Sequence, residues 1–339
     1  MHILIDAMGG DNAPDEIVRG AVLAVKEFDV GVTLIGQEKE VRRCLDACGD
    51  WPADRISIVD ADEVITMEDD PATATRNKKN SSMAVGLTML HKGEGDAFIS
   101  AGSTGALLSG ATLTVKRIRG IRRACFAPVI PNGGKGVIIA DCGANSECTA
   151  EYLLQFAYMG AFYAREILGI REPKVGLLNI GAEDSKGTEL QKETNALLRQ
   201  AAQEGRLCYM GNTESSELLT GRVDVMVCDG FSGNVLLKSV EGTAKFLMGE
   251  IKKIFYKNFK TKLAALAVKS DVGALKSMMD ASEIGGTPLL GLTKPVIKAH
   301  GSSDARAVRS AVLQAIRCVE ADVVGAIEAN IAQMRINNI

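Results

Sequence analysis

Six polar loops contain the residue types that could do chemistry. Each follows a short apolar run, and together they are residues 6–12, 100–105, 141–146, 179–187, 229–234 and 298–303. Their glycines leave room for a ligand, and a loop that opens a helix offers free N–H groups and the positive end of the helix dipole to an anion. Any one loop is also explained as a tight turn or a helix cap. Because all six are more polar than a turn requires, we predict a site for phosphate or another oxyanion.

Three of these loops carry the side chains best suited to catalysis. We expect His300, Lys186 and Asn234 to act on the substrate, since imidazole transfers protons, ammonium stabilises negative charge and an amide donates to an oxyanion. For His300, a purely structural hydrogen bond to a neighbouring loop is an equal alternative. The residues expected to bind phosphate or substrate are Asp6, Gly9, Gly10, Asn12, Gly102, Ser103, Thr104, Asn145, Asn179, Asp229, Lys298, Ser302 and Ser303.

Several familiar sites are absent from the sequence. The dinucleotide fingerprint G-x-G-x-x-G, the triphosphate loop G-x-x-x-x-G-K-[ST] and the nucleophile elbow G-x-S-x-G do not occur. The eight cysteines lack the spacing of metal ligands, and the acidic run over 60–70 lacks the central glycine and final glutamate of a calcium loop. We therefore expect no cofactor and no metal.

Charge and composition limit the classes of partner and compartment. The 39 Lys and Arg residues against 42 Asp and Glu give a net charge of −3, which provides no overall attraction to nucleic acid. Asp6 interrupts the stretch that a signal peptide needs to be apolar, and no eighteen consecutive residues are apolar. We expect a cytoplasmic protein with reduced cysteines that meets a membrane only at its surface.

Strand and helix patterns alternate along the chain. Short apolar runs predict strands over 3–5, 32–35, 56–59, 97–99, 137–140, 175–178, 223–227 and 296–298. Helical periodicity predicts helices over 14–27, 82–92, 149–168, 188–204 and 304–330. This alternation is typical of an α/β fold whose mostly parallel sheet is covered by helices on both faces. No linker interrupts it, so we predict a single domain over 1–339, in one lobe or two.

Two basic clusters lie outside the six loops. The first comprises Arg117, Arg119, Arg122 and Arg123. The second comprises Lys252, Lys253, Lys257 and Lys260, in an amphipathic helical segment at about 251–280. A helix with one basic and one large apolar face suits an anionic membrane surface, but its apolar face equally suits the core or a dimer contact.

Five motifs of this sequence resemble those of the bacterial phosphate acyltransferases of phospholipid synthesis. They are Asp6–Pro14, Ile99–Ala106, Asn179–Gly181 with Lys186–Gly187, Asp229–Phe231 with Gly233–Asn234, and the run Gly285–Ser303. Ser232 and Thr287 stand where the family pattern leads us to expect Thr and Ala. The resemblance implies a three-layer α/β/α fold, similar to isopropylmalate dehydrogenases and phosphotransacetylases, and a homodimer.

The resemblance also implies a reaction. Inorganic phosphate attacks a long-chain acyl thioester of acyl carrier protein, and the acyl phosphate passes to a membrane glycerol-3-phosphate acyltransferase. Phosphate is already anionic, so it needs positioning more than a strong base. Asn145, Asn234 and Ser302 are candidate donors to the oxyanion of the tetrahedral intermediate. We expect the arginine cluster to meet the acidic carrier protein and the lysine segment to meet the membrane.

Three other functions compete with this one. A short-chain phosphotransacylase acting on coenzyme A thioesters shares the fold and the phosphate site but needs no basic docking surface. A hydroxyacid dehydrogenase of the isopropylmalate type needs metal-binding Asp on adjacent helical turns, and no suitably placed D-x-x-x-D occurs. A peripheral membrane scaffold without catalytic activity has no use for six polar loops.

Overall fold

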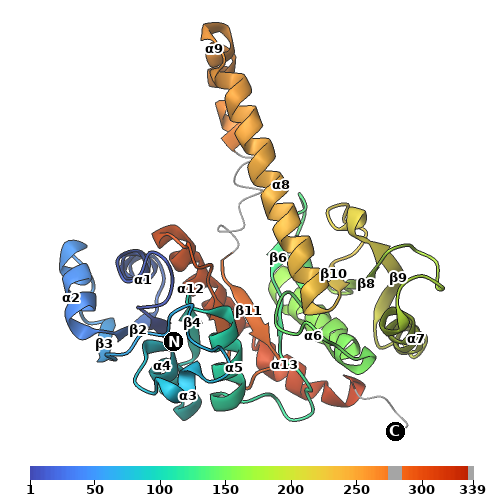
Figure 1. The fold of residues 1–339 in the computed structure, drawn as a ribbon, viewed down its shortest axis with the longest axis horizontal. Helices are drawn as coiled ribbons and strands as arrows, with labels where there is room; N and C mark the ends of the chain where they lie inside the picture. The colour runs from blue at the N-terminus through green and yellow to red at the C-terminus, as the bar shows by residue number, and fades with distance from the viewer. Residues whose placement is uncertain (274–284, 335–339) are drawn as a thin grey trace.

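Two sheets form the centre of the protein (Figure 1), whose computed structural model describes residues 1–273 and 285–334. The first contains β1 (His2–Asp6), β2 (Gly31–Gly36), β3 (Ile56–Asp60), β4 (Ala97–Ser100), β5 (Cys125–Phe126), β11 (Thr287–Leu290) and β12 (Val296–Lys298). Its order is β3-β2-β1-β4-β12-β11-β5, and all neighbours are parallel except β11, which runs antiparallel to β12 and β5.

The second sheet contains β6 (Val129–Ile130), β7 (Val137–Ala140), β8 (Lys174–Asn179), β9 (Cys208–Glu214) and β10 (Val225–Val227). Its order is β6-β7-β10-β8-β9, and only β6 is antiparallel. The chain crosses from the first sheet to the second between β5 and β6. Pro128, which has no N–H to donate to a strand ladder, lies at this crossing.

Helices cover both faces of the first sheet because side chains of a strand alternate between its faces. Ile3 and Ile5 share one core cluster with α1 (Asp15–Glu27) and α12 (Ala305–Glu320). Leu4 and Phe98 share another with α4 (Ser82–Lys92) and α5 (Thr104–Thr114). The smaller helices here are α2 (Glu38–Ala47) and α3 (Ala74–Asn77).

The second sheet is covered in the same way. Ile138 and Val225 pack in the same core as α6 (Ala150–Leu168), while Met226 on the other face packs with the base of α8 (Gly230–Tyr256). The remaining elements are α7 (Glu189–Gln203), α9 (Phe259–Ala267), α13 (Val323–Ala329) and the 3₁₀ turns η1 (Ser215–Glu217) and η2 (Ile331–Met334). The three-layer, mostly parallel α/β/α arrangement is therefore confirmed, with its strands divided between two sheets.

Two local expectations need correction. The helix expected over 304–330 is two helices, because Asp322 adopts a left-handed conformation with φ 44° and its carboxylate accepts the N–H of Gly325 at 3.1 Å, which starts α13. The strands β5, β6, β9 and β11 were not expected. Three of these have four residues or fewer, and β9 is a half-buried edge strand whose second half, Gly211–Glu214, is not apolar.

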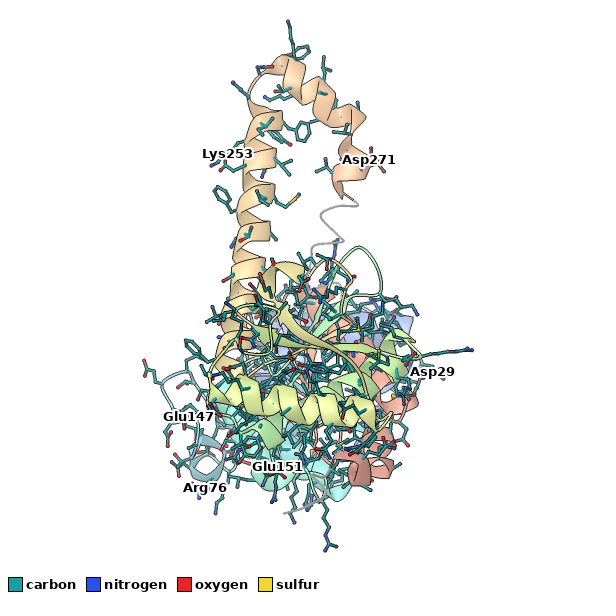
Figure 2. The ribbon with its side chains drawn as sticks, turned by 90° about the vertical axis from the view of Figure 1, so that its right-hand side faces the viewer. Asp29, Arg76, Glu147, Glu151, Lys253 and Asp271 are labelled. Carbon is teal, nitrogen blue, oxygen red and sulfur yellow. The ribbon has the colours of Figure 1, made fainter. Side chains whose placement is uncertain are left out.

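One helix leaves the body. The outer part of α8 extends away from both sheets and turns into α9, and we call residues 246–273 the arm (Figures 1 and 2). The arm contains the described part of the segment expected at 251–280, and residues 274–280 lie outside the described residues. In the described part of the chain, no helix combines the length and apolarity needed to span a bilayer.

Candidate functional site

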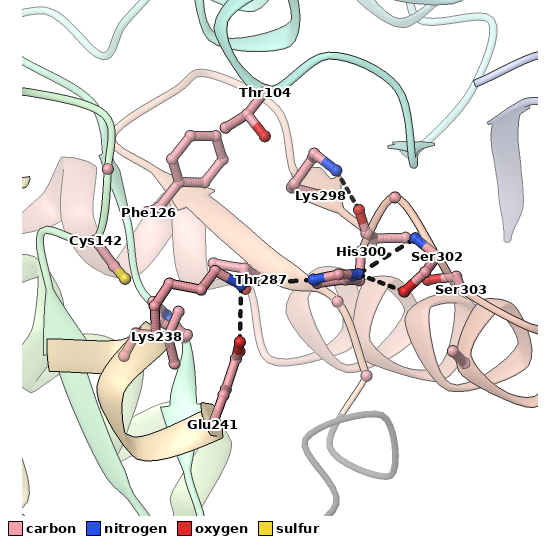
Figure 3. Close-up of a pocket in the computed structure, with 18 of the residues that line it drawn as sticks. Thr104, Phe126, Cys142, Lys238, Glu241, Thr287, Lys298, His300, Ser302 and Ser303 are labelled. Atoms are coloured by element: carbon pink, nitrogen blue, oxygen red, sulfur yellow. Dashed lines mark hydrogen bonds and ion pairs between the residues drawn. The ribbon is translucent and has the colours of Figure 1, made fainter. Parts of the chain in front are cut away.

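A cleft of about 860 Å³ opens between the two sheets. The loops after β4, β7 and β12 and the first turns of α8 line it, so it lies where the carboxyl ends of parallel strands bring polar loops together. Figure 3 shows these side chains around the cavity. The sequence-predicted residues that line the cleft are Thr104, Asn234, Lys298, His300, Ser302 and Ser303.

His300 lies at the centre of this group. Its Nδ1 is 2.9 Å from the hydroxyl of Ser302 and 3.2 Å from the backbone nitrogen of the same residue, while its Nε2 faces Lys238 Nζ at 3.5 Å. Partial burial lowers the pKa of His300, and the positive charge of Lys238 lowers it further. Both effects favour the neutral imidazole, which is able to accept a proton.

Lys298 provides a cationic group deeper in the cleft. Its ammonium donates to the carbonyl oxygen of Ala101 at 3.3 Å and to that of Ala299. Burial lowers the pKa of Lys298 to about 8, although the carboxylates of Asp6 and Asp11 oppose the shift. At neutral pH Lys298 is still mostly charged and is suited to hold an anion.

The loop after β1 supports the His300 loop from behind. Asn12 donates through Nδ2 to the carbonyl oxygens of Ser302 at 3.2 Å and Ser303 at 3.3 Å. Gly10 has φ 108°, and a Cβ there would lie 3.0 Å from the carbonyl oxygen of Gly301. Only glycine permits this approach. Asn12 and Gly10 thus position the cleft wall and do not line it.

Asp6 ties the same loop to the one after β4. It is 2% exposed and accepts the Ser100 hydroxyl at 2.6 Å and the Met8 N–H at 3.2 Å, and burial raises its pKa. A Cβ at Gly9 would lie 2.5 Å from the Asp6 carboxylate and 2.7 Å from the nitrogen of Gly102. The last predicted residue here, Ser103, accepts the N–H of Ala106 and caps α5. These residues hold the two loops together behind the cleft.

Asp141 plays the corresponding part in the second sheet, and sequence reasoning did not single it out. Its buried carboxylate accepts N–H groups of Phe126 at 2.9 Å, Cys142 at 2.6 Å and Asn145 at 2.7 Å. Burial raises the pKa of Asp141 to about 6. The Asn145 amide also donates to Asp141, and Asp229 caps α8 through Ser232, so both predicted residues are structural partners outside the cleft lining.

The loop over 179–187 lies outside the cleft lining. Asn179 donates to the carbonyl oxygen of Lys186 at 3.2 Å and accepts the N–H of Ile180 at 2.8 Å, which folds the loop on itself. Lys186 is exposed. The structure therefore does not bring Asn179 and Lys186 together with His300.

Several cleft residues were missed by sequence reasoning. Lys238, Glu241 and Lys245 line the cleft from α8, and Lys238 forms an ion pair with Glu241 at 2.8 Å. Together with Asn234 they recur every three or four residues, which is the spacing of one helix face and a signal that was available. The apolar wall consists of Phe126, Pro128, Val129, Ile130 and Leu237. The cleft therefore offers cations and a neutral imidazole beside apolar surface.

The basic clusters occupy two other places. In the arginine cluster, Arg122 pairs with Glu151 at 3.0 Å and Arg123 lies over the ring of Tyr152 at 5.5 Å, just before Phe126 of the cleft. The lysines lie at the end of α8 and the start of α9, where Lys253 pairs with Glu250 at 2.6 Å (Figure 2). Large apolar side chains surround them in the arm and are exposed, so they do not belong to the core of this chain; they are Phe246, Leu247, Ile254, Tyr256, Phe259, Leu263 and Leu266.

Comparisons with known proteins place the chain among relatives. The family model described as fatty acid synthesis protein matches residues 1–325. A phosphate acyltransferase of Geobacillus thermodenitrificans is 49% identical over 98% of this chain and 99% of its own length, and one of Acetivibrio thermocellus is 45% identical over 100% and 99%.

Solved structures with the same fold are more distant in sequence. A phosphotransacetylase of Streptococcus pyogenes matches 96% of this chain and 94% of its own with a TM-score of 0.62 at 19% identity. A branched-chain phosphotransacylase of Enterococcus faecalis matches 94% of this chain and 98% of its own with a TM-score of 0.55 at 15% identity.

Proposed function

The chain belongs to the family of fatty acid synthesis proteins that contains the phosphate acyltransferases, it transfers an acyl group to phosphate for phospholipid synthesis, and we propose that the donor is a long-chain thioester of acyl carrier protein. The observation that carries the proposal is the composition of the cleft. Lys298 and His300 lie at one side, and an apolar wall including Val129 and Leu237 lies at the other. Phosphate and a long acyl chain need these two environments side by side.

The sequence-predicted residues that line the cleft each have a proposed part in this reaction. Lys298 and the hydroxyls of Thr104, Ser302 and Ser303 hold the phosphate. The Asn234 amide donates to the oxyanion of the tetrahedral intermediate, where one positioned donor is worth about 3 kcal/mol. Lys186 and Asn179 are left out of the proposed site, because neither lines the cleft.

The reaction requires the transfer of one proton, and His300 is the proposed carrier. An oxygen of HPO₄²⁻ forms a bond to the thioester carbon, the carbon–sulfur bond breaks, and one proton must travel from phosphate to the departing sulfur. A neutral imidazole accepts that proton and returns it to the thiolate, so no second acid is needed. Nε2 of His300 is the atom turned toward the cleft and Lys238.

The arginine cluster is the proposed contact for the carrier protein. Arg119, Arg122 and Arg123 are exposed, and the cluster precedes Phe126 of the cleft wall by only a few residues. An acidic carrier docked here would be steered by charge and would present its thioester near the cleft.

The arm is the proposed membrane contact. Its exposed apolar side chains, with Lys252, Lys253, Lys257 and Lys260, suit an anionic bilayer surface, and part of the same apolar surface suits a second copy in a homodimer. Acyl phosphate is an amphiphile, so a cytoplasmic enzyme attached to the membrane would deliver it directly to a glycerol-3-phosphate acyltransferase there.

A thioester assay tests the donor. We expect phosphate-dependent release of carrier thiol from a long-chain acyl thioester of acyl carrier protein, without added nucleotide, flavin or metal. The matched reaction uses the coenzyme A thioester of the same acyl chain, and we expect it to be slower because it lacks the acidic docking partner. Equal rates, or a preference for a short-chain coenzyme A thioester, would identify a phosphotransacylase instead. A requirement for NAD or ATP contradicts both.

A further inference from the structure

A cation from one side of the cleft reaches the imidazole on the other. Lys238 belongs to α8, which follows a strand of the second sheet, whereas His300 follows the last strand of the first sheet. Lys238 Nζ lies 3.5 Å from His300 Nε2, and Glu241, one turn further along α8, holds the same ammonium at 2.8 Å (Figure 3). Lys238 and His300 are 62 positions apart in the sequence, and no sequence motif connects them.

We infer that Lys238 is a positioning residue for the acyl transfer, which acts through His300 by keeping the imidazole uncharged. The ammonium lies 3.5 Å from Nε2, so a protonated imidazole would place a second positive charge beside the first. On the other side of the ring, Nδ1 accepts the backbone N–H of Ser302 at 3.2 Å and lies 2.9 Å from the hydroxyl of the same residue, which fixes the ring orientation. This inference rests on the proposed function, because only that function assigns His300 a proton to accept.

Glu241 keeps the ammonium beside the imidazole, because it accepts a hydrogen bond from Lys238 Nζ at 2.8 Å while Nζ lies 3.5 Å from Nε2. Two positive charges this close repel each other, so the charged imidazolium is the disfavoured form of His300. Lys238 therefore keeps His300 in the form that can receive a proton from a phosphate bound in the cleft.

The charges around His300 predict the direction in which each substitution shifts its pKa. Lys238 and Lys298 lower the pKa of His300, whereas Glu241 and Asp11 raise it. Removal of Lys238 therefore raises the pKa of His300, and removal of Glu241 lowers it. If the neutral imidazole is the active form, the acid limb of the rate profile moves to higher pH in Lys238→Met and to lower pH in Glu241→Gln. Substrate ionisation is the same in every variant and does not affect this comparison.

The first measurement needs no substrate. The chain has only three histidines, so NMR titration of the imidazole signals, with His300→Ala for assignment, follows His300 directly. We expect opposite shifts in Lys238→Met and Glu241→Gln, and the wild-type titration in Lys238→Arg, which keeps the charge. Lys92→Met removes an exposed cation outside the cleft and should leave the titration unchanged. An unchanged titration in Lys238→Met, or shifts in the same direction, overturns the inference.

The second measurement is the pH profile of kcat/KM with acyl carrier protein thioester. Lys238→Met should lose up to about fivefold at acidic pH, the usual effect of a partly exposed charge pair, and should approach wild type at alkaline pH. A loss equal at every pH means that Lys238 does not act through His300 and overturns the inference. If the NMR shifts are as expected but the wild type does not transfer an acyl group to phosphate, the proposed function is refuted instead. The two outcomes can be told apart because the NMR titration needs no substrate.

Discussion

The cleft and the arm differ in whether their side chains find partners within the described chain. Behind the cleft, Asp6 is 2% exposed and Asp141 is fully buried, and both accept hydrogen bonds from their own loops and from neighbouring segments. In the arm, Phe259 is 75% and Leu266 is 69% exposed, and no core within the described residues covers them. The difference separates a region that is complete within the chain from one whose side chains call for an outside surface.

The largest expected effect tests whether the buried hydrogen bonds behind the cleft stabilise the fold. Asp141→Ala should lower the free energy of unfolding by about 3 kcal/mol or more, because several buried N–H groups lose their acceptor together. Urea unfolding followed by circular dichroism measures this. Asp46→Ala, which removes an exposed acid from α2, should stay within about 0.5 kcal/mol of wild type. Similar losses in both variants would show that the Asp141 loop is not a special support.

The next effect tests whether the arm binds an outside surface. The triple variant Lys253→Glu, Lys257→Glu and Lys260→Glu should bind anionic vesicles about a hundredfold more weakly or worse, since each lysine contributes about 1 kcal/mol near such a surface. Co-sedimentation at low salt measures it, and higher salt should weaken wild-type binding.

A matched control carries the same charge change on the body. Lys26→Glu, Lys39→Glu and Lys92→Glu together alter exposed lysines away from the arm, and this triple variant should bind vesicles nearly as wild type does. Equal binding by the arm variant and wild type, or no binding by wild type at low salt, would assign the exposed apolar surface to a dimer contact.

The smallest of the three effects lies within the cleft. His300→Ala should fold normally and lose roughly a hundredfold in kcat/KM, the usual worth of one positioned proton carrier. His91→Ala removes an exposed histidine at the end of α4 and should keep wild-type activity. Near-normal activity of a well-folded His300→Ala would leave His300 with only its hydrogen bonds to Ser302.

The sequence was informative where the residue pattern of a single strand or loop determines its structure. Apolar runs identified the buried parallel strands, and Gly, Asn and Ser identified the loops after them. It was uninformative where two distant segments meet: Asn12 appeared to be a phosphate ligand, although its amide is occupied by the carbonyl oxygens of Ser302 and Ser303. Spacing along a chain does not reveal which polar groups are already satisfied.

The full length of α8 was also hidden from sequence reasoning. Gly233, Gly242 and Gly249 interrupt its helical pattern, and each disfavours a helix by about 1 kcal/mol relative to Ala. A loop at 229–234 and a separate helix from 251 were therefore expected, whereas one helix runs from Gly230 to Tyr256. Its cleft-facing side, with Lys238 and Glu241, was missed although the spacing of these residues indicates one helix face.

The continuity of α8 makes it a lever. With 27 residues the helix is about 40 Å long, and it has Asn234 in the wall of the cleft near one end and Tyr256 at the other. No hinge loop separates these residues, so a tilt of the outer end is transmitted along the axis to the inner one. A surface that holds the tip therefore also orients the helix that carries Asn234 and Lys238.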